Sequence, residues 1–255
     1  MKRKGFKGIL LLLSMLFALT GCSVSEATQH GMAVDTIQAE DVLLRVDFLN
    51  VGQADCALLS TNGHYMVIDG GNNGDADTIL SYLEGQGVEK LDAVVGTHPH
   101  EDHIGSLDAI INHFDVDAVY MPKIMHTSKT FEDVLDAVAN KGLKIKSPSP
   151  GDTIDFNGLE IEVLGPQREY KDFNNNSIVL KVNAGETAFL FTGDAEETAE
   201  KDILQADYDL QADVLKVGHH GSSTSSSQAF LQAVKPKYAV ISVGVGNSYH
   251  HPEEE

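Results

Sequence analysis

A dense group of metal-ligand side chains constrains this chain more than any other feature. The group reads HPHEDH and directly follows Leu91–Gly96, an apolar segment that we predict to be a strand. Its ligand-type members are His98, His100, Asp102 and His103. Imidazole nitrogens and carboxylate oxygens are the donors that zinc, manganese and iron take in proteins. Such spacing arises by chance on the order of one time in a thousand, so we interpret it as a metal site.

The rest of the body alternates between strand-like and helix-like patterns. We predict strands at Val42–Leu49, Ala54–Ser60, Tyr65–Ile68, Leu91–Gly96, Ala118–Met121, Thr153–Phe156, Glu160–Leu164, Ile178–Val182, Ala188–Thr192, Val214–Val217 and Tyr238–Val243. We predict helices at Ala76–Leu83, Ile104–Phe114, Phe131–Lys141, Ala195–Ala206 and Ser226–Val234. The chain shows no internal repeat and no long linker, so we expect one α/β domain over residues 41–255, with helices covering its sheets.

The histidine-rich stretch resembles the hallmark motif of the metallo-β-lactamase superfamily, His-x-His-x-Asp-His. Three further positions fit the same resemblance: Asp69 before Gly70-Gly71, Asp194 in the run FTGD, and His219 in the run VGHHG. The resemblance implies an αββα four-layer sandwich. Four other stretches look like the hydrolase domain of the DNA-internalisation competence proteins (ComEC/Rec2 type). They are FLNVGQAD at 48–55, NNNS at 174–177, residues 213–222, and NSYHHP at 247–252.

The resemblance implies a centre of two divalent metal ions, zinc or manganese. His98 and His100 can bind one ion, Asp102 and His103 the other, and Asp194 can bridge both. Two adjacent cations lower the pKa of a shared water, and the bridging hydroxide can then attack a phosphodiester without a protein nucleophile. Asp69 is expected to orient ligands or water.

The sequence departs from the superfamily pattern in the middle of the chain. A further ligand histidine is missing there, because His113 and His126 lie in contexts that suggest bystanders and asparagines stand at the expected place. One metal subsite is therefore expected to have three protein ligands, to bind its ion weakly, or to fill only when substrate is present. Of the adjacent pair His219 and His220, we choose His219 as the ligand.

Other polar residues are candidates for contacts with the substrate. We assign Ser222 and Asn176 to substrate binding, and His251 to a phosphate contact or proton donation. The serines after His220 can alternatively form a polar turn that leads into a helix.

The N-terminus resembles a bacterial lipoprotein leader. Basic residues precede the apolar run Ile9–Leu19, which ends in LTGC. We predict a signal peptide at 1–21, lipid attachment to Cys22, and a flexible tether over 22–40. An ordinary secretory signal is the alternative. Either reading places the mature protein outside the cytoplasmic membrane, and the lipid would anchor it to the outer face.

The end of the chain also departs from the competence-type pattern. Those relatives continue with a helix and a strand beyond the position of Glu255. We therefore expect an incomplete edge on the second sheet, or a truncated product. The remaining cysteine, Cys56, lies in an apolar run and is expected in the core.

The leading functional hypothesis is a metal-dependent phosphodiesterase that acts on extracellular DNA. The formal net charge of −20 opposes binding of a polyanion, although five lysines between 123 and 146 could form a basic face. The alternatives are a hydrolase of smaller phosphodiesters, such as cell-wall phosphocholine esters, and a catalytically decayed metal-binding surface lipoprotein. No protein partner can be inferred.

Overall fold

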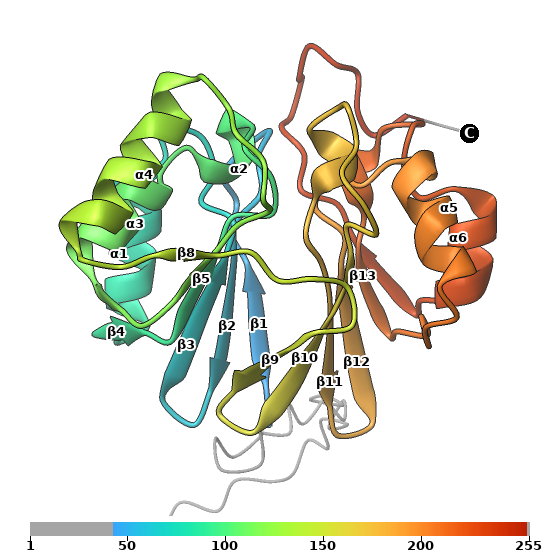
Figure 1. The fold of residues 1–255 in the computed structure, drawn as a ribbon, viewed down its shortest axis with the longest axis horizontal. Helices are drawn as coiled ribbons and strands as arrows, with labels where there is room; N and C mark the ends of the chain where they lie inside the picture. Colours follow the sequence, from blue (N-terminus) through green and yellow to red (C-terminus); the bar gives the residue numbers. More distant parts are fainter. Residues whose placement is uncertain (1–42, 254–255) are drawn as a thin grey trace, which may run out of the picture. The chain divides into compact units, whose positions relative to one another are not determined.

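The structure is a computed structural model that describes residues 43–253, all within one compact unit. Two six-stranded sheets face each other in its centre (Figure 1). The N-terminal sheet has the order β1 (Arg45–Phe48), β2 (Ala57–Thr61), β3 (His64–Ile68), β5 (Ala93–Val95), β7 (Val119–Tyr120) and β8 (Ile145–Lys146). The C-terminal sheet has the order β14 (Tyr238–Val240), β13 (Val214–Lys216), β12 (Thr187–Phe191), β11 (Val179–Ala184), β10 (Leu159–Gly165) and β9 (Thr153–Phe156).

Helices cover the outer face of each sheet. The helices on the N-terminal sheet are α1 (Ala76–Gly85), α2 (Glu101–Ile104), α3 (Leu107–His113) and α4 (Lys129–Asn140). Those on the C-terminal sheet are α5 (Glu197–Gln205) and α6 (Gln228–Val234). A small parallel pair, β4 (Lys90–Leu91) and β6 (Asp115–Val116), forms a separate two-stranded sheet. The predicted αββα arrangement is confirmed.

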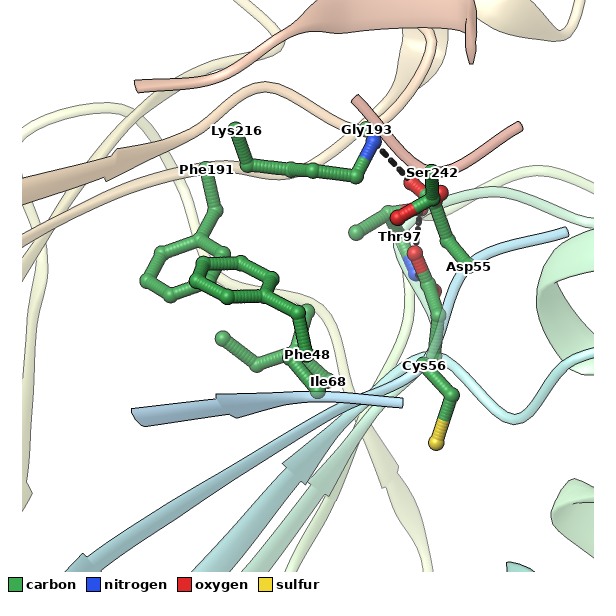
Figure 2. A pocket seen from close by; sticks show the side chains of 11 residues that line it. Phe48, Asp55, Cys56, Ile68, Thr97, Phe191, Gly193, Lys216 and Ser242 are labelled. Atoms are coloured by element: carbon green, nitrogen blue, oxygen red, sulfur yellow. Dashed lines mark hydrogen bonds and ion pairs between the residues drawn. The ribbon is translucent and has the colours of Figure 1, made fainter. Parts of the chain in front are cut away.

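Alternation along the central strand β3 shows that both faces of the N-terminal sheet are buried there. In β3, Met66 and Ile68 face the other sheet, whereas Val67 between them faces the helices. Strand side chains point to opposite faces in turn, so a strand covered on both sides must be apolar throughout. Phe48 and Phe191 meet between the sheets with ring centroids 5.9 Å apart (Figure 2).

Two predicted elements are divided in the structure. The strand Leu91–Gly96 becomes β4, which pairs with β6, and β5, which pairs with β3 and β7; Asp92 between them accepts hydrogen bonds from His64 and from the backbone of Tyr65. The predicted helix Ile104–Phe114 starts earlier and is interrupted at Gly105 and Ser106, which gives α2 and α3. Part of the histidine-rich stretch therefore lies on a short helix rather than in a loop.

The interruption brings two backbones into close contact. Gly105 donates its amide hydrogen to the carbonyl oxygen of Gly71 at 2.8 Å, and Ser106 donates to Gly70 at 3.0 Å. A Cβ at position 105 would lie only 2.2 Å from the carbonyl carbon of Asn72. Only glycine fits here, and the contact fixes α2 beside the loop that follows β3.

The predicted leader, Cys22 and tether lie outside the described residues. Within residues 43–253, every helix is too short or too polar to cross a bilayer. Cys56 is buried in the core as expected, and burial raises the pKa of its thiol. In this part of the chain, β14 pairs with β13 alone and forms one edge of its sheet.

We expect Gly105→Ala to lower the free energy of unfolding by about 1–3 kcal/mol, since the new methyl group collides with backbone that cannot yield. Urea denaturation measures the change. Gly85→Ala is the matched control: no atom lies within 4 Å of its added Cβ, and it should be neutral or slightly stabilising. Equal stability of the two variants would contradict the close contact at Gly105.

Candidate metal centre

The candidate ligands lie where strands end, on one edge of the sandwich. Asp69 follows β3 and His98 follows β5, two parallel neighbours in the N-terminal sheet. Asp194 follows β12, and the 3-10 turn Gly218–Gly221 follows β13, two parallel neighbours in the C-terminal sheet. Parallel strands bring their carboxyl ends to the same edge, so residues far apart in sequence converge there.

The side chains form two groups that share one carboxylate. The first group is His98, His100 and Asp194, and the second is Asp102, His103, Asp194 and His220; within each group the ligand atoms lie within 4.8 Å of one another. His98 Nε2 is 3.6 Å from Asp194 Oδ2, and His103 Nε2 is 3.1 Å from Asp194 Oδ1. Asp194 thus lies between two candidate subsites.

The donors fit divalent cations in chemistry and in burial. His98, His103 and Asp194 are at most 2% exposed. His103 Nε2 and Asp194 Oδ1 are close but make no aligned hydrogen bond. Buried polar atoms without partners are costly, and a cation between these atoms would satisfy both. Mixed nitrogen and oxygen donors suit zinc and manganese alike.

Electrostatics keep the carboxylates ionised despite burial. Burial alone raises the pKa of Asp194, but His103, His98 and His220 outweigh it and hold that pKa well below its usual value. Burial likewise opposes ionisation of Asp102, but the hydrogen bond from His220 and the charge of His103 lower its pKa to about 2. Burial and the nearby His103 lower the pKa of His98, which favours the neutral, ligand form.

Asp69 contacts His103 of the second group on the side of the ring that faces away from Asp194. Its Oδ2 accepts from His103 Nδ1 at 2.9 Å, while its Oδ1 accepts from the Thr97 backbone at 2.7 Å. This leaves His103 Nε2 directed toward Asp194. The contact is the orienting interaction that ligand histidines commonly receive from carboxylates.

The structure places His220, rather than His219, in the second group. His220 is 2% exposed, and its Nε2 lies 3.2 Å from Asp102 Oδ2. His219 stands outside both groups: its Nε2 is 3.9 Å from Asp194, and its Nδ1 is 3.3 Å from Glu196. Both histidines have positive φ, of 48° and 55°. Two consecutive left-handed residues are uncommon outside glycine, and this backbone turns the neighbouring rings to different places.

A cavity of about 530 Å³ opens over the two groups. Its lining includes His251, whose Nδ1 is buried without a hydrogen-bond partner, and Asn174, whose Oδ1 is also buried without one. Tyr249 stacks on His251, with ring centroids 5.7 Å apart and an interplanar angle of 14°. These three side chains line the cavity beside the candidate ligands.

Neither predicted substrate contact lines this cavity. Asn176 is 2% exposed, and its side-chain amide bonds to the backbone of Tyr170. It accepts from the Tyr170 N–H and donates to the Tyr170 carbonyl oxygen. Ser222 Oγ bonds to Thr224. Asn174, two residues before Asn176, is the asparagine that faces the cavity. The asparagine run was the signal in the sequence. Which of its members faces the cavity depends on the 3-10 turn Asn174–Asn176, and the sequence alone does not predict that turn.

Other candidate residues have structural roles. His113 pairs with Glu84 on the surface, whereas the His126 ring stacks edge-on against Phe173 at 4.6 Å and belongs to neither group. The serines after His220 form a hydrogen-bonded turn that leads into α6. Ser225 Oγ donates to the Ala195 carbonyl oxygen, and Ser227 caps α6. Of the five lysines, Lys129 pairs with Asp133, and none lines the cavity.

Comparison with known proteins identifies the class. The model of the metallo-β-lactamase superfamily matches residues 49–245. The chain therefore belongs to the metallo-β-lactamase superfamily, as its motifs and four-layer fold indicate.

Two of the relatives to which this chain is similar are named for competence or for the ComE operon. ComE operon protein 3 of Bacillus subtilis is 31% identical over 229 residues, covering 82% of this chain and 30% of the relative. Competence protein ComA of Neisseria gonorrhoeae is 33% identical over 208 residues, covering 80% and 28%. The chain thus spans less than a third of these relatives. Human tRNase Z, short form, shares the fold with a TM-score of 0.51 at 12% identity, covering 78% of this chain and 92% of that one.

We expect the protein to unfold at a higher temperature when Zn²⁺ or Mn²⁺ is added. At a metal concentration about 100-fold above Kd, one occupied site adds about 2.7 kcal/mol to the free energy of unfolding. Asp194→Asn should lose most of this gain, because Asp194 belongs to both groups. His113→Asn, on the surface, is the control and should keep it. An unchanged shift in Asp194→Asn would exclude a role for this carboxylate in metal binding.

Proposed function

We propose that the protein is a metal-dependent phosphodiesterase, with DNA as its first candidate substrate. The observation that carries the proposal is the single carboxylate, Asp194, shared by two ligand groups at the floor of an open cavity. Adjacent divalent ions favour in-line displacement at phosphorus. The competence relatives support DNA, although this chain covers less than a third of their length.

The ligands divide naturally between two subsites. His98, His100 and Asp194 would hold one ion; Asp102, His103, Asp194 and His220 would hold the other. When bound, the two ions supply positive charge that lowers the pKa of water and neutralises phosphoryl oxygens. The first subsite has three protein ligands, in keeping with the missing middle histidine.

Residues around the ligands orient the reaction. Asp69 fixes the ring of His103, and the Thr97 hydroxyl in turn donates to Asp69 at 2.9 Å. Burial and the neighbouring His219 lower the pKa of His251, so a neutral imidazole faces the cavity and offers one N–H donor. We assign His251 to a hydrogen bond with a phosphoryl oxygen, and Asn174 rather than Asn176 to a polar contact beside it.

A specific observation favours a second substrate class, a small phosphodiester such as a choline ester. The cavity lining contains Glu101, Asp102 and Asp194, and no lysine or arginine. The chain as a whole carries a net charge of −20. A small diester needs less electrostatic attraction than a polyanion does.

We also propose where the protein acts in the cell. The run LTGC before Ser23 supports a lipid anchor on Cys22, and hence action at the outer face of the cell membrane.

We expect the protein with Mn²⁺ or Zn²⁺ to cleave linear DNA, bis-p-nitrophenyl phosphate, or both. Loss of one subsite removes several kcal/mol of transition-state stabilisation, so His100→Ala should reduce kcat/KM by about a thousandfold. His113→Asn is the matched control. Cleavage of the small diester alone would select the second substrate class. Absence of turnover of both substrates by folded, metal-loaded protein would overturn the phosphodiesterase proposal.

His251→Ala should reduce kcat/KM for the same diesters by about 100-fold, because a positioned hydrogen-bond or proton donor contributes at least this much. His250→Asn is the control: its side chain is exposed, and asparagine tolerates its φ of 62°. Steady-state kinetics at matched metal occupancy measure both variants. Equal rates in the two would remove His251 from the reaction.

A further inference from the structure

A buried ion pair lies directly behind the candidate metal centre. Lys216 Nζ is 2.7 Å from Asp55 Oδ2, and both side chains are almost fully buried, at 5% and 6% exposure (Figure 2). Lys216 ends β13 in the C-terminal sheet, whereas Asp55 precedes β2 in the N-terminal sheet. Desolvation of two charges often cancels their attraction, so stability alone is a weak reason for this pair.

Asp55 reaches the two histidines of the second ligand group. Its Oδ1 is buried without a hydrogen-bond partner and lies 3.5 Å from His220 Nδ1; its Oδ2 lies 4.0 Å from His103 Nδ1. His220 Nδ1 is also 3.0 Å from the carbonyl oxygen of Ser242. These acceptors favour a hydrogen on Nδ1, so a divalent ion bound beside Asp102 would replace the hydrogen that Nε2 donates to that carboxylate and would meet the Nε2 lone pair.

The same carboxylate belongs to a third group of potential ligands. Asp55, Asp69 and His103 bring ligand atoms within 4.8 Å of one another, all of them buried. By composition this group could attract a cation. The Lys216 ammonium already supplies one there, and it also donates to the Val217 carbonyl oxygen at 2.9 Å. His103 therefore keeps Nδ1 on Asp69 and presents Nε2 to Asp194.

We propose that Lys216 is a positioning residue: its ammonium takes the cation position beside Asp55, keeps divalent ions out of the third group, and holds His220 through Asp55. Divalent ions are thereby confined to the side of His103 that faces Asp194. The inference rests on the metal centre of the proposed function, and it adds a reason why only two of the three ligand groups bind metal.

The test measures metal binding in the full chain. Lys216→Met removes the ammonium and keeps the rest of the unbranched side chain as far as the ε position. We expect it to bind a further equivalent of Zn²⁺, or to bind its second equivalent with an affinity changed at least tenfold. Equilibrium dialysis with elemental analysis gives the stoichiometry, and calorimetric titration gives the affinities. Lys181→Met is the matched control, because Lys181 is equally buried and paired with Asp209 away from the cavity.

A second variant keeps the test decisive if Lys216→Met fails to fold. Asp55→Asn preserves shape and removes the charge that faces His220. We expect it to weaken one of two Zn²⁺ equivalents by 10- to 100-fold and to leave the other within about twofold. Folded variants with wild-type stoichiometry and affinities would overturn the role of Lys216. Absence of Zn²⁺ binding by the wild-type protein would instead overturn the metal centre itself.

Discussion

The site depends on the contacts between the buried carboxylate of Asp194 and the histidines around it. An isolated ionised group at 2% exposure is very costly, so its neighbours must supply positive charge or hydrogen. They come from both halves of the sandwich: His98 follows β5 and His103 lies on α2, whereas His220 lies in the turn after β13. The two sheets must therefore meet in one relative position at this edge, and packing between them in the core maintains it.

Backbone conformation at this edge is demanding as well. Asp69, His219 and His220 all have positive φ although none is glycine, and each such residue costs of order 1–3 kcal/mol. Gly193, before Asp194, is where a Cβ would lie 2.9 Å from the hydroxyls of Ser177 and Thr97. Strain and close approach are concentrated where the ligands converge, as expected when geometry at a site is maintained by the surrounding fold.

Sequence spacing indicates the parts of this candidate site that follow strands, whereas local backbone geometry decides which of two neighbouring side chains faces it. The histidine-rich stretch and Asp194 could be found because each follows an apolar strand, and strand ends converge at one edge of a parallel sheet. The choice between His219 and His220 could not be predicted from the sequence, because it depends on two left-handed residues in succession, a backbone that the residue types do not indicate. Asn174 and Asn176 differ in the same way, since a tight turn directs one toward the cavity and uses the other internally. Lys216 and Asp55 are 161 positions apart, and only the packing of one sheet on the other brings them together.

Charge links metal binding to the choice of substrate. Three carboxylates line the cavity without a lysine or arginine, in a chain of net charge −20. Without compensating charge, this surface repels a phosphodiester before any contact forms. Two divalent cations would bring four positive charges against those three carboxylates and reverse the local sign. Binding of an anionic substrate should then require the metal even in the absence of chemistry, and the distant surface charge should weigh more heavily on a long polyanion than on a single diester.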